Sequence, residues 1–531
     1  MPAFKITSLC LVPLLIAAVL LLPAGCSHRD NYFVVALSDP ISTLDPIGSP
    51  TIDAASERVR VLMFNSLVRK NEKFEYVPEL ATNIQTAPDG LSVTFTLHDG
   101  VTFHDGRPLT SADVKYTFDS LFAANSGKSA SFFEGSGASK QPFVTAVEAP
   151  DPLTVIFRLR QPWLSLMTNL VSISIIPKDS AGQQKDHPVG SGPFKFSRFD
   201  SSQQVVDLEA FPNYWQGAPQ IPTLRVRVIG DANALQAELR SSRVDLAPLP
   251  TNLTSDAFKA LERDPNLQVL QFPGANFYHL TFNTASPPLD NVRVRQAIAY
   301  AIDRESIIRD LLLGQGKIAH SILPEESWAY SPGQIYSYDP GKAKQLLDEA
   351  GFRDPDGDGP QMRFPKPIVF KISSSSNMIR QYTGVMQNYL KQVGVPVEIE
   401  TAETNTLRDQ LRLGQFQITS ANWIGGNQDP VFYRDLFLSS EIPTQDRASR
   451  NRSRYRNPEL DRLIEEAVNT ADREKARSLY VQIQDIVSRE LPLLPLWYPA
   501  NMVVARKSVG NIKVDGSGDW GFIRNLTVEK K

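Results

Sequence analysis

The sequence predicts a multidomain protein of the mixed α/β class. With 531 residues, the chain is longer than one hydrophobic core usually organises, so two or three domains are expected. From residue 287 onward, segments with helical apolar spacing alternate with short strand-like runs, and this order predicts a mixed α/β lobe. The composition, with 42% hydrophobic and 21% charged residues, is typical of a globular protein. A net charge of −3 disfavours nucleic acid as a partner, because nucleic-acid binders usually carry a basic face or arm.

An apolar run at residues 6–22 opens the chain and is followed by three small or turn-forming residues and then Cys26. Such a short run before a cleavage site is typical of a secretory signal and not of a membrane-spanning helix. A cysteine at the first mature position resembles the signal of bacterial lipoproteins, in which the thiol carries the lipid. We therefore expect residues 1–25 to be a lipoprotein signal peptide and Cys26 to anchor a periplasmic or cell-envelope protein to the membrane. The alternative is an uncleaved N-terminal anchor, and both readings export the rest of the chain.

Strand-like runs separated by turns dominate the first half of the chain. A strand is expected at 32–37, and the loop after it contains Ser42 and Thr43 and closes at Asp45-Pro46. Thr110 followed by Asp113 is a capping-box pattern, which predicts the start of a helix. The remaining expected elements are helices near 59–67 and 235–239, strands at 91–97, 144–149, 154–159 and 224–229, a turn that leads into 101–103, and a tight turn at 190–196 that leads into another strand.

Capped helices alternate with strands in the second half. One helix is expected from Pro288 to Gly314 and another from Pro340 to Gly351, because proline favours a helix start and glycine a helix end. A strand at 368–372 leads through four serines into a helix that ends at Gly394. The later expected elements are a strand at 395–399, a helix at 407–413, a strand ending at Trp423, helices from 458 and from 472, a proline-rich crossing segment at 491–499, and strands at 502–505 and within 511–528.

The strand that ends at Trp423 is the strongest candidate for a ligand site. Asn422 and Trp423 stand just before Gly425 and Gly426, with one residue between, so an indole wall and an amide occupy a strand end. Ligand sites in α/β sheets lie beyond the carboxyl ends of strands. The alternative is a buried core tryptophan followed by a surface turn.

Five sequence motifs occur in an order that is found together in one protein family. They are S-T-L-D-P at 42–46, D-G-V-T-F-H-D-G-R-P-L-T-S-A-D-V at 99–114, V-G-S-G-P-F at 189–194, V-R-Q-A-I-A-Y-A-I-D-R at 294–304 and A-K-Q-L-L-D-E-A-G-F at 343–352. The chain resembles the family 5 extracellular solute-binding proteins, which include the dipeptide-, oligopeptide- and nickel-binding proteins of ABC importers. The resemblance covers nearly all of residues 31–528.

This resemblance implies a two-lobed, type II periplasmic-binding-protein-like fold with an additional small α+β domain. Lobe I would comprise residues 27–60, 180–272 and 502–531, the additional domain 61–179, and lobe II 273–501. The implied function is a substrate-binding lipoprotein that captures a peptide or peptide-like solute by hinge closure and delivers it to the ABC permease. A monomer without cofactor or enzymatic activity is expected.

The resemblance also indicates which residues face the ligand. Ser42 and Thr43 would face it from one lobe, and Ser373, Ser375, Asn422, Trp423, Gly426 and Asp429 from the other. Peptide-binding members carry a Trp-x-x-Asp pattern whose carboxylate binds the peptide amino group, but Gly426 occupies that position here. Either Asp429 reaches the ligand instead, or the ligand is not a free-amine peptide, because a buried ammonium without an anion is costly. The serines at 373–376 could also cap the helix that follows them.

Other chemistry is less well supported by the sequence. Asp354, Asp356 and Asp358 match the first half of a calcium loop, but Pro365 stands where a bidentate glutamate is required, so we expect an acidic turn instead of a metal site. No nucleophile-elbow or Walker motif occurs, and both cysteines lie at the N-terminal end. The remaining alternatives are an oligosaccharide or metal chelate as ligand, or a secreted hydrolase that uses Asp45 and Asp429 as paired carboxylates.

Overall fold

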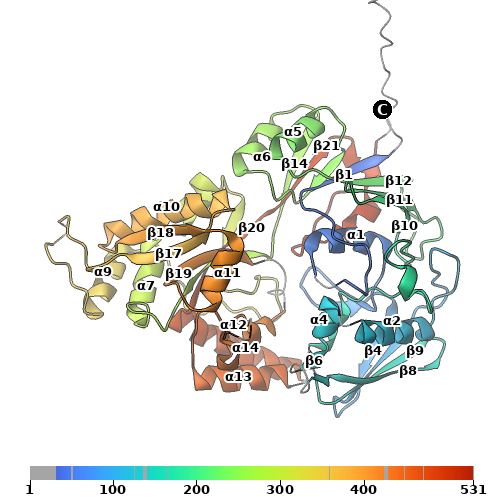
Figure 1. Ribbon diagram of the computed structural model, residues 1–531, viewed down its shortest axis with the longest axis horizontal. Coiled ribbons are helices and arrows are strands. Elements are labelled where there is room, and N and C mark those ends of the chain that lie inside the picture. The colour runs from blue at the N-terminus through green and yellow to red at the C-terminus, as the bar shows by residue number, and fades with distance from the viewer. Residues whose placement is uncertain are drawn as a thin grey trace, which may run out of the picture. The chain divides into compact units, whose positions relative to one another are not determined.

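The computed structural model describes residues 32–49, 52–124, 126–134, 140–163, 165–357, 359–423, 429–445, 447, 449–470 and 472–529. The predicted signal peptide, Cys26, Asp358 and Gly426 lie outside these residues. Three larger sheets and their flanking helices organise the chain from Phe33 onward (Figure 1). The mixed α/β class predicted from the sequence is confirmed.

The first sheet combines strands from the beginning, middle and end of the chain. Its order is β10-β11-β12-β1-β13-β21-β14, and Figure 1 shows blue β1 and red β21 in the same sheet. The strand bounds are β1 (Phe33–Leu37), β10 (Phe194–Asp200), β11 (Val205–Ala210), β12 (Thr223–Val228), β13 (Leu246–Pro248), β14 (Leu267–Phe272) and β21 (Asn501–Arg506). Helix α1 (Ala54–Met63) shares one apolar core with this sheet, and α5 (Ala232–Arg240) and α6 (Ser255–Glu262) share another.

The second sheet has six strands in the order β16-β20-β15-β19-β17-β18. Parallel strand β17 lies between β18 and β19, whereas β15 runs antiparallel to both β19 and β20. The strand bounds are β15 (Phe277–Phe282), β16 (Gly316–Ile318), β17 (Ile368–Ser373), β18 (Val397–Ala402), β19 (Ile418–Trp423) and β20 (Leu493–Pro499).

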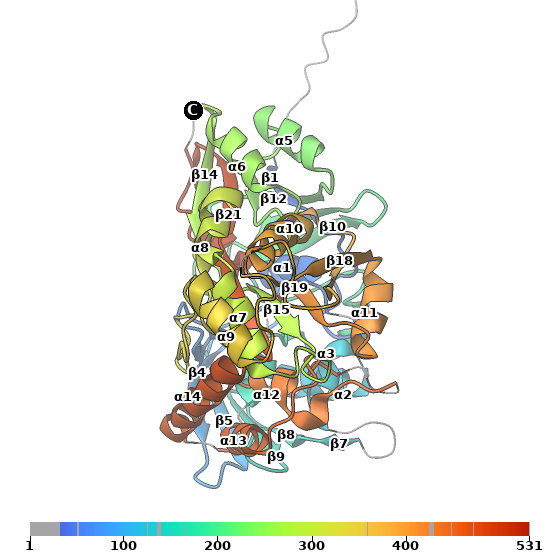
Figure 2. The ribbon, with the colours of Figure 1, turned by 90° about the vertical axis from the view of Figure 1, so that its left-hand side faces the viewer.

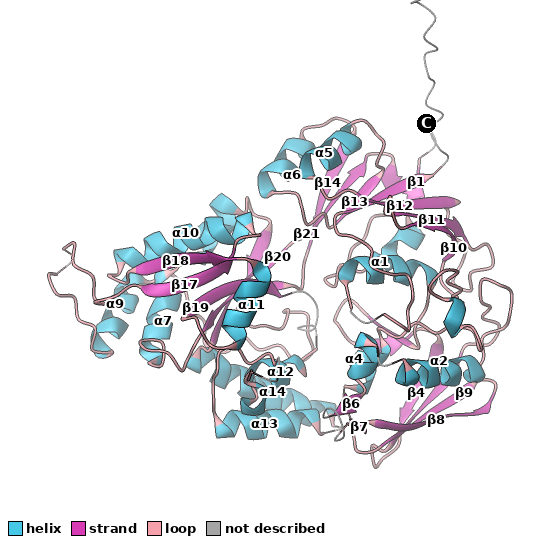
Figure 3. Ribbon diagram, viewed as in Figure 1, coloured by secondary structure: helices cyan, strands magenta, loops and turns pink. Residues whose placement is uncertain are grey.

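Helices cover the second sheet through two separate apolar cores (Figure 3). One core contains residues of α7 (Val292–Ala301), α9 (Pro340–Glu349) and α10 (Asn377–Gln392), and α7 and α9 lie side by side (Figure 2). The other core contains residues of α12 (Phe432–Phe437), α13 (Pro458–Val468) and α14 (Arg473–Glu490). A short helix α11 (Thr404–Arg412) packs through Leu407 and Leu411.

The third sheet is antiparallel and has the order β4-β5-β9-β8. Helix α2 (Ser111–Ala123) packs against it through Val114, Phe118 and Leu121, and the predicted capping box of Thr110 and Asp113 is confirmed. The strand bounds are β4 (Ala81–Thr86), β5 (Ser92–Leu97), β8 (Val144–Asp151) and β9 (Thr154–Leu159). The domain limits given above stay predictions.

Short helices and two-stranded ribbons complete the described structure. The ribbons pair β2 (Val68–Lys70) with β3 (Tyr76–Pro78), β6 (Phe133–Glu134) with β7 (Gln141–Pro142), and β22 (Val509–Gly510) with β23 (Thr527–Val528). The short helices are α3 (Gly127–Ala130), α4 (Leu166–Leu170), α8 (Arg304–Ser306), η2 (Ala181–Gln183), η3 (Ile307–Leu311), η4 (Ser439–Glu441) and η5 (Trp520–Asn525).

Three predicted elements of the second half differ in the structure. The tail expected to be strand-like at 511–528 contains the helix η5, because Asp519 caps it by accepting a hydrogen bond from the Gly521 amide (2.6 Å), and only residues 527–528 form a strand. The single helix expected up to Gly314 ends at Ala301, because Asp303 caps a new turn by accepting a hydrogen bond from the Ser306 amide (2.9 Å). The expected crossing segment at 491–499 is mostly strand β20. Proline is tolerated there because the register between β15 and β20 shifts where His279 faces Pro495.

Candidate functional site

The indole of Trp423 forms a partly buried wall at the carboxyl end of β19. Its ring packs on Phe432, with ring centroids 4.7 Å apart, and the Arg450 guanidinium lies 5.7 Å from the ring centroid. Strands β15 and β19 pair in register, so Trp423 faces Phe277 and Thr419 faces Thr281. The alternation of side chains along strands places Thr419, Ala421 and Trp423 on one face.

A cavity of about 120 Å³ lies against this face. Strand residues His279, Thr281 and Thr419 line it together with Leu436 and Phe437 of α12. The remaining wall includes Asn422, Trp423 and residues 450, 452 and 453. A site therefore exists at the strand end that the sequence singled out, and most of its walls come from residues that the sequence did not indicate.

Several polar atoms around the cavity have no hydrogen-bond partner among the described residues. They are Nε2 of His279, Oγ1 of Thr419 and Oδ1 of Asn422. His279 is 5% exposed and Thr419 is 3% exposed, and such buried polar atoms are normally paired. The other ring nitrogen of His279, Nδ1, is hydrogen-bonded to the Thr281 hydroxyl (3.1 Å). Burial, together with the charge of Arg452, lowers the pKa of His279 to about 3, so the imidazole is neutral at pH 7.

Of the two arginines beside the cavity, only one is paired with a carboxylate among the described residues. Arg450 forms an ion pair with Asp435 (2.6 Å). Within the described parts of the chain, no carboxylate lies within ion-pair distance of Arg452. Burial lowers the pKa of the Arg452 guanidinium, and the neighbouring charges of Arg408 and Arg450 lower it further. The cavity wall therefore carries excess positive charge.

Ser373 and Ser375 lie at the end of β17, next to the candidate site strand. Their hydroxyls are hydrogen-bonded to each other (2.8 Å) and to the hydroxyl of Thr404 (2.9 and 3.2 Å). The cap of α10 is Ser376, whose hydroxyl accepts a hydrogen bond from the Ile379 amide (3.3 Å). The expectation that one of these serines caps the helix is confirmed.

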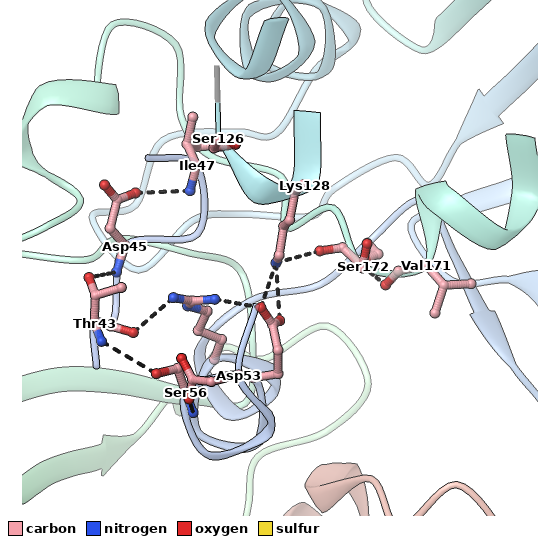
Figure 4. A network of polar contacts seen from close by, with 12 residues as sticks. Thr43, Asp45, Ile47, Asp53, Ser56, Ser126, Lys128, Val171 and Ser172 are labelled. Carbon is pink, nitrogen blue, oxygen red and sulfur yellow. Dashed lines mark hydrogen bonds and ion pairs between the residues drawn. The ribbon is translucent and has the colours of Figure 1, made fainter. Parts of the chain in front are cut away.

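The loop that contains Ser42 and Thr43 is fixed by internal contacts (Figure 4). The amides of both residues donate to the Ser56 hydroxyl (3.1 and 3.3 Å), and the Ser42 hydroxyl donates to Asp53. The Asp45 carboxylate accepts hydrogen bonds from the amides of residues 47 and 48 (2.9 and 3.0 Å). Asp45 therefore serves as a turn former in this loop.

An ion network with two buried cations contacts this loop (Figure 4). Glu57 pairs with Arg60 (2.5 Å) and with Lys128 (3.0 Å), and Arg60 also donates to the carbonyl of Thr43 (2.9 Å). Lys128 is buried, and its ammonium donates to the carbonyl of Ser172 (2.7 Å). Burial lowers the pKa of Lys128, whereas Glu57 raises it. The network links α1 to residues of α3 and to the chain after α4.

Asp429 is buried, with 5% exposure, and its carboxylate is already engaged by protein groups. It accepts hydrogen bonds from the hydroxyls of Tyr76 and Thr168 and from the Val431 amide (2.8 Å). Burial and the charge of Asp429 raise the pKa of Tyr76 well above its ordinary value. No pattern in the sequence indicates the contacts with Tyr76 and Thr168, which lie more than two hundred and fifty positions away. A direct contact between Asp429 and a ligand stays a prediction.

The acidic segment at 354–359 has turn-like contacts. Asp354 accepts hydrogen bonds from the amides of Asp356 (3.2 Å) and Gly357 (3.0 Å) and lies 3.5 Å from the Arg363 guanidinium. Among the described residues, which do not include Asp358, no group of three acidic, histidine or cysteine side chains is arranged to hold a metal ion. A separate search of the described helices found none with the length and apolar character needed to span a membrane.

Comparison with known proteins places the chain among solute-binding proteins. The family model for bacterial extracellular solute-binding proteins, family 5 Middle, matches residues 75–445. Heme-binding protein A of Haemophilus influenzae is 31% identical over 501 residues, which is 88% of this chain and 87% of that protein. The dipeptide-binding protein of Escherichia coli is 30% identical over 504 residues, which is 90% of each chain.

A solved structure gives the corresponding match in three dimensions. The oligopeptide-binding protein AppA of Bacillus subtilis, in complex with a nonapeptide, has a TM-score of 0.71 and 26% sequence identity. The match covers 94% of this chain and 99% of that chain. This agreement confirms the two-lobed type II fold expected from the sequence motifs.

Proposed function

Because this chain belongs to the bacterial extracellular solute-binding proteins of family 5, we propose that it captures a peptide or peptide-like solute for an ABC importer. Members of this family bind solutes for ABC transporters and are not enzymes, so the hydrolase alternative is set aside. The observation that carries the peptide assignment is the nearly full-length match to a structure that holds a nonapeptide.

We place the ligand at the carboxyl ends of β17 and β19. These two strands are parallel neighbours, so Ser373 and Ser375 emerge at the same sheet edge as Asn422 and Trp423. Ser42 and Thr43 follow β1 in the first sheet and would contact the ligand from the other lobe. Gly426 and Asp429 complete the proposed set.

We further propose that the two lobes close around the solute by a hinge. In support, the chain passes between the first and second sheets twice, from β14 to β15 and from β20 to β21. The two connections run close together, since the Asn501 side chain donates to the carbonyl of Pro273 (3.2 Å). Two adjacent connections restrict relative motion to one main bending mode, and a ligand that touches both lobes favours the closed state.

Free-amine dipeptides should bind poorly to this protein. Gly426 replaces the carboxylate that peptide-binding relatives use for the amino group, and the Asp429 carboxylate already accepts hydrogen bonds from the hydroxyls of Tyr76 and Thr168. Calorimetric titration with matched free-amine and N-acetylated peptides measures this preference. Sub-micromolar affinity for simple dipeptides that is lost on acetylation would instead indicate that Asp429 binds the peptide amino group.

A ligand screen tests the proposed function itself. The protein is unfolded and refolded to remove any carried-over solute, and thermal unfolding is then followed with peptides of two to nine residues, heme, nickel chelates and oligosaccharides. A ligand at a hundred times its dissociation constant adds about 2.7 kcal/mol to the free energy of unfolding. Stabilisation by peptides supports the proposal. Stabilisation by heme, a nickel chelate or an oligosaccharide alone replaces the peptide with that solute.

Substitution of the indole locates the binding site. Trp423→Leu should weaken binding of the best ligand in the screen by about tenfold or more, because a buried aromatic wall contributes on the order of 1–3 kcal/mol to binding. Trp163→Leu is the matched control, since Trp163 is also partly buried and packs on Phe143 and against the apolar core of the third sheet. Equal affinity of both variants and the unmodified protein would remove Trp423 from the site.

We also propose that the mature protein is a monomer anchored by lipid at Cys26, from which it passes its solute to the permease. Mass spectrometry of the protein isolated from membranes should find a lipid-modified cysteine at the mature N-terminus. Cys26→Ser should release the protein from the membrane or leave the signal uncleaved. An unmodified N-terminus beginning at Met1 would favour the uncleaved anchor.

A further inference from the structure

The cavity between β15, β19 and residues 450–453 has the features of a binding site that is incomplete without an anion. We infer that this cavity, which we call the arginine pocket, binds a carboxylate group of the captured solute. The inference rests on the proposed function and adds the chemical class of the solute. The residues that carry it are His279, Thr419, Arg450 and Arg452, all of which line the cavity.

Hydrogen-bonding capacity is the first argument. Nε2 of His279 and Oγ1 of Thr419 are buried and have no partner among the described residues. A buried polar atom without a partner costs on the order of 1–3 kcal/mol. The neutral imidazole can donate from Nε2, and the Thr419 hydroxyl can also donate. Both side chains line one cavity, and two donors at one site match the oxygens of a carboxylate, which only accept hydrogen bonds.

Charge is the second argument. The charges that act on Arg452 are those of Arg408 of α11 and of Arg450, and both are positive. Arg450 and Asp435 compensate each other, which leaves the half-buried Arg452 without a carboxylate among the described residues. A carboxylate at this point would form a charge-assisted hydrogen bond with Arg452, an interaction roughly twice as strong as a neutral one.

The size of the cavity and its opening to the surface also suit a carboxylate group. A cavity of about 120 Å³ exceeds several times the ~30 Å³ that one water molecule occupies in the liquid, so it can hold a carboxylate with its adjoining carbon atoms. The Arg450 side chain is 55% exposed, so the pocket reaches the protein surface. Trp423 lines the pocket and also belongs to the proposed ligand site, which connects the two.

Matched peptides measure the preference. Calorimetric titration compares tripeptides that differ only by glutamate against glutamine at each position, and compares each C-terminal acid with its amide. The acidic member of one pair should bind about tenfold or more tightly, as expected for one hydrogen bond to a charged group. The first comparison identifies a side-chain carboxylate, and the second identifies the peptide C-terminus.

Two variants assign that preference to the arginine pocket. Arg452→Gln should remove the preference for the acid, whereas Arg408→Gln should keep it, since Arg408 is exposed and does not line the cavity. Thr419→Val keeps the shape of the side chain and removes the hydroxyl. It should weaken binding of the acidic peptide and leave unchanged or raise the melting temperature of the ligand-free protein, because it removes an unpaired buried polar atom.

The outcomes separate this inference from the proposed function. Peptides that bind without an acid preference, or with a preference that survives Arg452→Gln, overturn the inference and leave peptide capture intact. A Thr419→Val variant that loses thermal stability without losing affinity identifies the pocket as a water-filled cavity only. If the folded protein binds none of the peptides, both the inference and the peptide assignment fall.

Discussion

Gly190 and Gly192 allow the backbone of one motif to lie directly on α1. A Cβ atom at Gly192 would lie 2.4 Å from the carbonyl carbon of Met63, and one at Gly190 would lie 2.2 Å from the Met63 carbonyl oxygen. The Gly192 amide donates to that oxygen (2.8 Å). The V-G-S-G-P-F motif therefore depends on the absence of side chains at these two positions.

Gly192→Ala should destabilise the protein by about 1–3 kcal/mol, the usual cost of overpacking a filled site. Urea unfolding measures this loss as a lower midpoint. Gly182→Ala is the control, because a Cβ atom at Gly182 meets nothing within 4 Å. Equal midpoints for the two variants would show that the chain after α1 moves aside easily.

His104 joins a second motif to the same turn and makes it sensitive to acid. Its Nδ1 accepts from the Gly190 amide (3.3 Å), so Nε2 carries the proton and donates to the Gly192 carbonyl (3.0 Å). Burial lowers the pKa of His104 from 6.5 to about 4. Below pH 6.5 the unfolded chain binds a proton that the folded protein does not, so the stability from this residue is complete above pH 6.5 and is lost progressively toward pH 4.

Replacing His104 should flatten the dependence of stability on pH in this window. The wild-type protein should lose on the order of 3 kcal/mol from this residue between pH 6.5 and pH 4, at about 1.4 kcal/mol for each unit of pKa shift. Urea unfolding of His104→Gln at several pH values measures the slope, and the exposed His187→Gln serves as control. An unchanged slope in His104→Gln would mean that other groups dominate acid unfolding.

At the scale of elements, helix ends are set by single side chains. Ser376 begins α10, Asp303 begins the turn after α7, and Gly351, with a φ of +92°, follows the end of α9. A left-handed residue of this kind is easily accommodated only by glycine. These local signals explain why most helices of the second half were predicted close to their observed positions.

Ser376→Ala should destabilise the protein by about 1 kcal/mol, because it removes the acceptor for the Ile379 amide at the start of α10. Chemical unfolding measures the change. Ser374→Ala is the matched control two residues earlier, at an exposed position outside the cap. A loss of stability in Ser374→Ala equal to that in Ser376→Ala would contradict the assignment of the cap.

At the scale of the whole molecule, the two connections between the first and second sheets meet at Gly274. A Cβ atom at this position would lie 2.0 Å from the Pro499 carbonyl oxygen. The strands before and after it, β14 and β15, belong to different sheets. A substitution at Gly274 therefore affects how the predicted lobes move relative to each other more directly than it affects the packing of either core.

Gly274→Ala should lower both the free energy of unfolding, by about 1–3 kcal/mol, and the affinity for the ligand identified in the screen. Urea unfolding and calorimetry measure the two effects. Gly384→Ala is the control, because Gly384 lies within α10 with open space around its Cβ position and alanine favours a helix. If Gly274→Ala destabilised the protein but left its affinity unchanged, the connection between the sheets would have no role in ligand capture.

The sequence by itself determined the α/β class, most strands and helices, the two-lobed fold through the family motifs, and the strand end at Trp423. The class, the elements and the strand end follow from local periodicity, capping residues and glycine positions, all of which act over a few residues, whereas the two-lobed fold was implied by the resemblance to the family. Three predictions were wrong. The helix expected to continue to Gly314 ends at Ala301, because the Asp303 cap starts a new turn despite the continuing apolar pattern. The segment at 491–499 is mostly strand despite its prolines, because a register shift accommodates Pro495. The tail at 511–528, expected to be strand-like, contains the helix η5, which Asp519 caps.

Only the tertiary structure decided which residues surround that strand end. Antiparallel pairing brings His279 next to residues about 140 positions later in the chain, and the loop after α12 adds Arg450 and Arg452. Likewise, the Asp429 carboxylate meets Tyr76 and Thr168. No local pattern marks such contacts, because they arise when the sheet and its helices bury their apolar faces and thereby fix which distant polar groups meet.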